Sequence, residues 1–157
     1  MKKLKLYLDT SIFNFAKAED VPFEKDVTLK LLDEIKTEKY EAYISEIVVL
    51  EISRAPAEVA MKLREVINSV NLIELPVDEN SQLLAKKYIE QGIIPAKYED
   101  DALHIAIASV NNLDVIVSWN YKHIVKLKTK REVTGINALL GYKEIEIYSP
   151  LEVIEDV

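Results

Sequence analysis

Short runs of apolar residues recur five times along the chain, in patterns that predict β-strands. In the first run Leu4, Leu6 and Leu8 alternate with Lys5 and Tyr7, as expected for a strand with one buried face. The predicted strands span residues 4–8, 41–45, 72–76, 114–118 and 144–148. Longer segments separate them, and these segments follow a different period.

Apolar residues at helical spacing occupy the segments between the strands. In the first of them, Val27, Leu31, Leu32 and Ile35 share one helical face. The predicted helices run from Pro22 to about Lys36, from Glu46 to about Arg54, from Pro56 to about Val70, from Asp78 to Gly92, and from Glu99 to about Asn112. A last predicted helix ends near Gly141. This alternation predicts one α/β domain, with a largely parallel five-stranded sheet flanked by helices.

Residues suited to helix ends support these boundaries. Pro22 can occupy the first turn of a helix, and the side chains of Ser45 and Asp78 can cap the helices that follow them. Gly92 is a good residue to close a helix, because glycine adopts the left-handed conformation without steric cost. No linker-like or repetitive segment divides the chain.

Asp9 lies where the first predicted strand ends, in the sequence Asp-Thr-Ser. One interpretation is a helix cap, for a helix that includes Phe13 and Phe15. The other is a ligand in a functional site, because open α/β sheets bind ligands beyond the carboxyl ends of their strands. The segment 118–120 (Ser-Trp-Asn) follows another predicted strand in the same way.

Glu51 is a carboxylate on the apolar face of a predicted helix. Ile47 lies one turn before it and Ala55 one turn after it, and an unpaired carboxylate is costly to bury there. An ion pair with Arg54 is the structural alternative, although Arg54 projects toward the polar side of the helix.

Asp101 also points inward on a helical wheel, since it shares a face with Ile105 and Ala108. Its neighbour Asp100 shares a face with His104 and is the expected solvent-side or capping residue. Favourable charge at a helix N-terminus is the alternative explanation for both aspartates.

Asp9, Glu51 and Asp101 would repel one another if the fold brought them together, and a divalent cation would relieve that repulsion. The ligand set contains only oxygen, which favours Mg²⁺ or Mn²⁺. Such an ion polarises a phosphoryl oxygen and lowers the pKa of water, so a phosphodiester is the expected substrate class.

The composition limits the possible functions. The chain has 157 residues, 49% of them hydrophobic, which suffices for one globular core. It has no cysteine, no apolar run of membrane-spanning length and no signal-peptide core at its start, so a cytoplasmic protein is expected. A net charge of −7 argues against a passive nucleic-acid binder, but not against an enzyme that meets phosphate through bound cations.

Four motifs together resemble the PIN domain, the metal-dependent nuclease fold of VapC-like toxins and several RNA-processing enzymes. They are LYLDTSIF, ISEIVVLEISR, EDDALHIAIA and DVIVSWNYKHI, in this order over nearly the whole chain. The resemblance implies an acidic site of Asp9, Glu51 and Asp101, with the hydroxyl groups of Thr10 and Ser118 helping to orient it.

Asn120 departs from that pattern, because PIN domains often carry a fourth carboxylate at this position. An amide oxygen can still ligate a hard cation or orient water, but it brings no charge. One firmly held metal ion is therefore expected rather than two.

The segment 122–131 is rich in basic residues and follows Asn120 directly. It can form a phosphate-contacting rim beside the acidic site, or simply a solvated helix face. The candidate RNA-binding residues are Trp119, Lys122, His123, Lys126 and Lys128. Trp119 could stack on a base or anchor its loop, His123 could contact phosphate or brace the loop, and His104 is expected to be a polar helix residue rather than a ligand.

The sequence thus favours a Mg²⁺- or Mn²⁺-dependent ribonuclease that hydrolyses phosphodiester bonds in RNA. The resemblance also suggests the toxin of a toxin–antitoxin pair, with a small antitoxin protein as a partner and a homodimer as a possible assembly. The alternative is a catalytically weak or inactive PIN-like module that binds RNA or protein. A haloacid-dehalogenase-type phosphatase is set aside, because Ser11 stands where its second aspartate is required.

Overall fold

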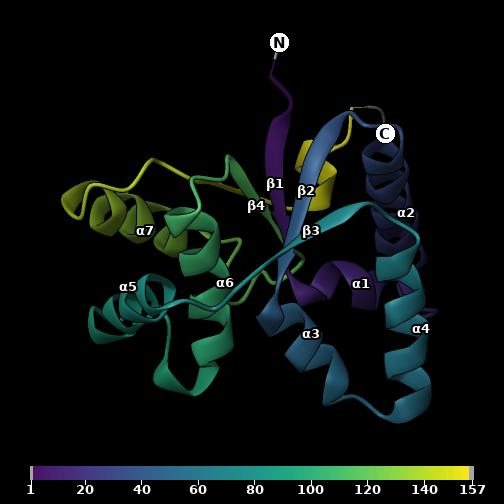
Figure 1. Cartoon of the computed structure of the whole chain (residues 1–157), viewed down its shortest axis with the longest axis horizontal. Helices are drawn as coiled ribbons and strands as arrows, with labels where there is room; N and C mark the ends of the chain where they lie inside the picture. Colours follow the sequence, from purple (N-terminus) through teal and green to yellow (C-terminus); the bar gives the residue numbers. More distant parts are fainter. Residues whose placement is uncertain (1, 156–157) are drawn as a thin grey trace.

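A computed structural model describes residues 2–155 and contains one parallel sheet (Figure 1). The strands are β1 (Leu4–Leu8), β2 (Tyr40–Ser45), β3 (Leu72–Leu75), β4 (Val115–Val117) and β5 (Glu146–Tyr148). Their spatial order is β3-β2-β1-β4-β5, and every neighbouring pair is parallel. The predicted α/β class and five-stranded sheet are confirmed, although β4 and β5 are shorter than predicted.

Helices connect the strands as the apolar periodicity predicts. They are α1 (Thr10–Lys17), α2 (Pro22–Lys36), α3 (Glu46–Ser53), α4 (Ala57–Asn68), α5 (Glu79–Glu90), a short 3-10 helix η1 (Ala96–Tyr98), α6 (Glu99–Val110), α7 (Leu127–Leu139) and α8 (Pro150–Val153). Ser45 and Asp78 accept hydrogen bonds from the backbone N–H groups of Ile47 and Ser81, which confirms both as N-caps. Gly92 has a φ of +75° after α5, as its closing position requires.

The helix α8 is absent from the sequence prediction, which placed the last helix near Gly141. It follows β5 and begins at a capping box. The side chain of Ser149 accepts the backbone N–H of Glu152, and the side chain of Glu152 accepts the backbone N–H of Ser149. A serine followed by proline, with glutamate three residues after the serine, is a detectable start signal for so short a helix.

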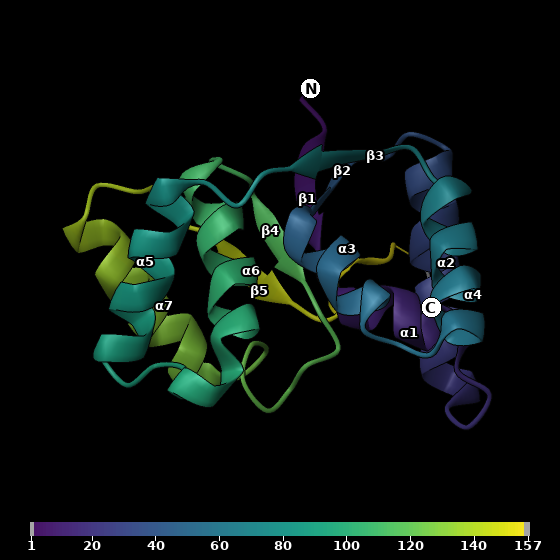
Figure 2. The same ribbon diagram turned by 60° about the horizontal axis from the view of Figure 1, so that its bottom comes forward.

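The two faces of the sheet are covered by different helices, and each has its own apolar core. Leu6 and Leu8 pack on one face with residues of α1, α2 and α4, while Tyr7 and Ile116 pack on the other face with residues of α5, α6 and α7. Figure 2 shows these two groups of helices on opposite sides of the strands. The residues of α3 divide between the cores, since Val48 belongs to the first and Ile47 to the second.

The carboxyl ends of β1, β2 and β4 meet at one edge of the sheet because these strands are adjacent and parallel. Asp9 follows β1, Ser45 ends β2, and Ser118 follows β4. The chain winds in opposite directions from β1, toward β2 on one side and toward β4 on the other, which is the arrangement that creates a ligand-binding crevice in such sheets. No helix within residues 2–155 is long and apolar enough to cross a membrane.

Candidate active site

Asp9 is buried beyond the end of β1, and both of its carboxylate oxygens accept hydrogen bonds from hydroxyl groups. Ser11 Oγ donates to Oδ1 at 2.6 Å, and Ser118 Oγ donates to Oδ2 at 2.6 Å. Asp9 does occupy the N-cap position of α1, but its side chain makes no capping hydrogen bond. The interpretation of Asp9 as a helix cap is therefore wrong, because its carboxylate turns toward β4 instead.

Glu51, on α3, is held by residues from two other elements. Thr10 Oγ1 donates to its Oε1 at 2.7 Å, and Nε2 of His104, on α6, lies 2.5 Å from the same oxygen. Arg54 instead forms its ion pair with Asp100 at 2.7 Å, and it acts on Glu51 only through its charge, which helps to lower the pKa of Glu51. The inward position predicted for Glu51 brings it to the same edge of the sheet as Asp9.

His104 was expected to be a polar helix residue rather than a ligand, on the same face as Asp100, the expected solvent-side residue. It does lie on a helix, but it is 1% exposed and connects α6 to two other elements. Its Nδ1 lies 2.6 Å from the hydroxyl oxygen of Tyr7, which in turn lies 2.7 Å from Ser45 Oγ. A continuous buried chain of hydrogen bonds thus runs from Ser45 through Tyr7 and His104 to Glu51.

The pKa directions of Glu51 and His104 agree with an ion pair. Burial alone would raise the pKa of Glu51, but the hydrogen bond and charge of His104 and the hydroxyl of Thr10 lower it below its usual value. Burial alone would lower the pKa of His104, but Glu51 and the nearby carboxylates of Asp9 and Asp101 raise it. These directions favour a protonated His104 beside an ionised Glu51.

Asp101 completes the acidic group from the first turn of α6. Its pKa is raised mainly by burial and also by the charge of Glu51, whereas His104 and a hydrogen bond from Asn120 lower it. The pKa of Asp9 is likewise raised, first by burial and also by Glu51. Glu51 raises the pKa of both aspartates, and all three carboxylates raise the pKa of His104, so the carboxylates predicted from separate motifs lie around the same histidine.

Asn120 supports the site through both ends of its amide. Its Oδ1 accepts the backbone N–H of His123 at 2.9 Å, and its side chain hydrogen-bonds to Asp101. That hydrogen bond shapes the loop after β4 and leaves the second lone pair of Oδ1 free, so the predicted role of this oxygen with metal or water stays a prediction. Ser11, which the prediction did not single out, joins this loop to Asp9 because it also accepts the N–H of Trp119.

A pocket opens beside these groups, lined by Glu51, Asp101 and the segment 96–100. Its donors are carboxylate oxygens, the type of ligand that Mg²⁺ and Mn²⁺ prefer. Within residues 2–155, no group of three or more histidine, cysteine, aspartate or glutamate side chains is already arranged to hold a metal ion. The donor chemistry fits a hard cation, but the carboxylates are held by hydroxyl groups and by His104.

Trp119 does not have the RNA-stacking role that the sequence offered as one possibility. It is 6% exposed, its indole N–H donates to Thr28 Oγ1 at 2.7 Å, and its ring stacks on Phe15. It anchors the loop after β4 to α1 and α2. Tyr121, two residues later, is 55% exposed and is the accessible aromatic side chain of that loop.

The basic residues after Trp119 have different neighbours. Lys122 Nζ lies 5.5 Å from the ring centroid of Tyr98, and the ring of His123 packs on the same tyrosine. Lys126 is the exposed N-cap residue of α7, near enough to His123 to lower its pKa. Lys128 Nζ instead donates to the carbonyl oxygen of Gly92 at 3.0 Å, so it faces the end of α5.

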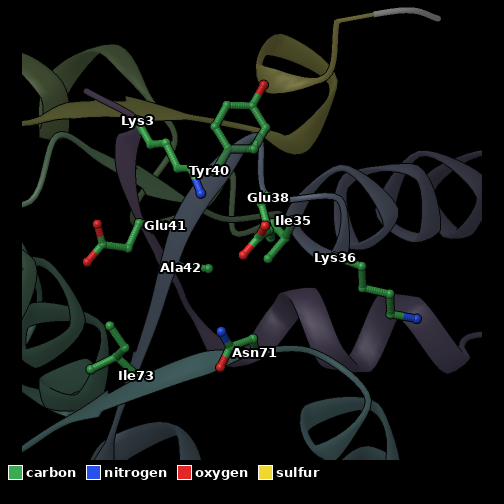
Figure 3. A pocket seen from close by; sticks show the side chains of 9 residues that line it. All are labelled: Lys3, Ile35, Lys36, Glu38, Tyr40, Glu41, Ala42, Asn71 and Ile73. Carbon is green, nitrogen blue, oxygen red and sulfur yellow. The ribbon is translucent and has the colours of Figure 1, made fainter. Parts of the chain in front are cut away.

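A second pocket lies at the opposite end of the sheet, where β1, β2 and β3 begin (Figure 3). Lys3, Tyr40, Glu41 and Ile73 are among the side chains around it. It is far along the strands from Asp9 and contains no comparable group of carboxylates, so the acidic edge remains the candidate active site.

Comparisons with known proteins reveal a shared fold. No protein-family model and no curated protein sequence matches this chain. A chain in the crystal structure of VapBC2 from Rickettsia felis, bound to a DNA fragment from their promoter, is similar with a TM-score of 0.58 and 15% identity, over 93% of this chain and 98% of that one. A chain in the crystal structure of VapBC-5 from Mycobacterium tuberculosis, a member of the VapBC family of toxin–antitoxin systems, is similar with a TM-score of 0.52 and 17% identity. The similarity covers 92% of this chain and 98% of that one. The PIN-like fold expected from the sequence is confirmed.

Proposed function

We propose that this protein is a metal-dependent ribonuclease that hydrolyses phosphodiester bonds in RNA. The observation that carries the proposal is the convergence of Asp9, Glu51 and Asp101 at the crevice between β1 and its neighbours. Burial, and to a smaller extent the charge of Glu51, raises the pKa of Asp9 and of Asp101, a pattern that is common in functional sites. In this proposal the three side chains hold one Mg²⁺ or Mn²⁺ ion.

The surrounding residues would position these ligands. Ser11 and Ser118 fix Asp9, Thr10 and His104 fix Glu51, and Asn120 fixes Asp101. A hard cation bound there supplies polarisation of a phosphoryl oxygen and a lower pKa for water. Partners of this kind, one step removed from the ion, typically matter about 10- to 100-fold for metal affinity.

Titration with Mn²⁺ tests the proposal without relying on cleavage. Wild-type protein is expected to bind Mn²⁺, and Asp9→Asn and Asp101→Asn are each expected to abolish binding because the remaining ligands cannot hold the ion. Asp33→Asn is the matched control, since Asp33 is an exposed carboxylate on α2 that does not line the acidic pocket. Wild-type protein that binds no Mn²⁺, or variants that bind as well as wild type, would overturn the proposal.

We further propose that the protein is the toxin of a toxin–antitoxin pair, with a small antitoxin as its partner. The fold shared with chains of two VapBC structures supports this role. We expect a small gene directly upstream of the gene for this chain. Expression of this chain alone should arrest growth, and co-expression of the upstream gene should relieve the arrest. Harmless overexpression of the chain without any partner would contradict it.

The second candidate is a PIN-like module that binds RNA or protein without cutting. The absence of a ready-made metal cluster within residues 2–155, together with an amide at Asn120 in place of a carboxylate, favours it. Binding of RNA that is unchanged by Mn²⁺ and by Asp9→Asn would decide for this candidate.

A further inference from the structure

We propose that Tyr98, packed against His123, is a stacking site for an unpaired RNA base, and that the ammonium groups of Lys97 and Lys122 bind the phosphates beside that base. The inference rests on the proposed ribonuclease function and specifies its substrate as single-stranded RNA. It assigns a role to Tyr98 and Lys97, which the sequence motifs did not single out.

The two rings come from separate segments that the fold brings together. Tyr98 ends η1, and His123 belongs to the loop between β4 and α7. Their ring centroids lie 4.1 Å apart with 36° between the ring planes. The Nζ atoms of Lys97 and Lys122 lie 5.7 and 5.5 Å from the centroid of the tyrosine ring.

Both segments are fixed relative to the carboxylates. Tyr98 directly precedes α6, whose first turn carries Asp101, and it lines the same pocket as Glu51 and Asp101. The backbone N–H of His123 donates to Asn120, whose side chain hydrogen-bonds to Asp101. A base on Tyr98 would therefore place its own strand beside the acidic group.

The charges around this pocket explain why lysines are needed there. Glu51, Glu99, Asp100 and Asp101 all line it, and such a surface repels a phosphate backbone. Lys97 and Lys122 are exposed, and their long unbranched side chains can move from the tyrosine ring to a phosphate. They supply the local positive charge that a strand would need next to the carboxylates.

His123 carries an unused polar atom at this place. Its Nε2 is buried and has no hydrogen-bond partner, an uncommon state for a buried polar group. Burial and the charges of Lys122 and Lys126 lower the pKa of His123, which favours a neutral ring. A neutral His123 ring leaves the positive charge beside Tyr98 to Lys97 and Lys122.

Single-stranded RNA fits this arrangement better than a duplex. A base exposes its flat face to an aromatic side chain only when it is unstacked from its neighbours. Stacking on an aromatic ring tolerates any base, so the site predicts a preference for unpaired strands rather than for one sequence.

The test is binding of a short fluorescent oligouridine, measured by anisotropy in EDTA so that the strand is not cut. Tyr98→Ala is expected to weaken binding about 5- to 100-fold, because stacking on one ring is lost. Tyr98→Phe keeps the ring and is expected to bind like wild type. Tyr121→Ala is the matched control, since it removes an exposed tyrosine of the same loop whose ring packs on Trp119 instead of His123.

A second variant keeps the test valid if Tyr98→Ala fails to fold. Lys97→Ala combined with Lys122→Ala removes two exposed side chains and is expected to reduce the slope of affinity against salt by about 2. Duplex RNA should bind wild type less tightly than the single strand, and Tyr98→Ala should remove that preference.

Several outcomes would overturn the stacking site. These are unchanged affinity in Tyr98→Ala, a loss confined to Tyr121→Ala, equal binding of duplex and single strand by wild type, or an unchanged salt slope in the lysine variant. The result is separate from the nuclease proposal, which fails if Mn²⁺ does not bind. If the wild-type protein binds no metal but Tyr98→Ala still weakens RNA binding, the stacking site stands. The protein is then an RNA-binding module rather than a nuclease.

Discussion

Two buried hydrogen-bond networks, each built around a fully buried tyrosine, illustrate how differently this fold uses polar groups. In the first, Tyr7 joins Ser45 to His104 and, through it, to Glu51. In the second, Tyr88 on α5 donates to Asn137 on α7 at 2.5 Å, and Asn137 donates to Ser109 on α6 at 2.9 Å.

The networks differ in charge and in where they lead. The network around Tyr88 contains only hydroxyl groups and one amide, and it stays between three helices. The network around Tyr7 contains a histidine and a carboxylate, and it ends at a side chain that lines an open pocket. Burial raises the pKa of both tyrosines, so each keeps a neutral hydroxyl group. The comparison suggests that the first network serves a site and the second serves packing.

The largest expected effect follows from removing the histidine of the first network. His104→Ala should lower the free energy of unfolding by about 3 kcal/mol or more, because Glu51 and Tyr7 would lose a buried partner. It should also weaken Mn²⁺ binding. Urea unfolding and Mn²⁺ titration measure both effects. Asn137→Ala in the second network should destabilise the protein but leave Mn²⁺ binding intact.

A matched pair of smaller changes separates stability from site chemistry. Tyr7→Phe and Tyr88→Phe each remove one buried hydroxyl group and should each cost about 1 to 2 kcal/mol of stability. Tyr7→Phe alone should also weaken Mn²⁺ binding, by about tenfold, because His104 would no longer be held in position. Equal Mn²⁺ affinity in the two variants would break the distinction between the networks.

The smallest expected effect extends the comparison to the surface lysines. Lys126 lies near His123 and the acidic edge, whereas Lys128 contacts the carbonyl of Gly92, just after the helix that carries Tyr88. The double change Lys126→Ala with Lys128→Ala should weaken RNA binding and flatten its salt dependence. Lys128→Ala alone should change little. An unchanged salt slope in the double variant would remove this segment from the RNA-binding surface.

Much of the fold could be predicted because its signals are local. Alternating apolar residues gave β1, helical spacing gave α2, and the caps Ser45 and Asp78 placed two helix starts within a residue. The inward positions of Glu51 and Asp101 followed from the same wheel geometry, and α/β topology placed Asp9 at the edge where they meet. Their functional role stays a prediction until Mn²⁺ binding is measured.

Other features were decided by the tertiary structure alone, because a helical wheel gives the direction of a side chain but not what covers it. His104 shares its face with Asp100, yet every residue from Ala102 to Ser109 is buried, since α6 packs between the sheet and other helices. Trp119 follows a strand end like a surface residue but is covered by α1 and α2. The amino-acid sequence determined which groups carry charge and on which side of each element they lie. Only the packing of distant elements decided which of those charges meet, because hydrogen bonds such as Tyr7–His104 join residues 97 positions apart.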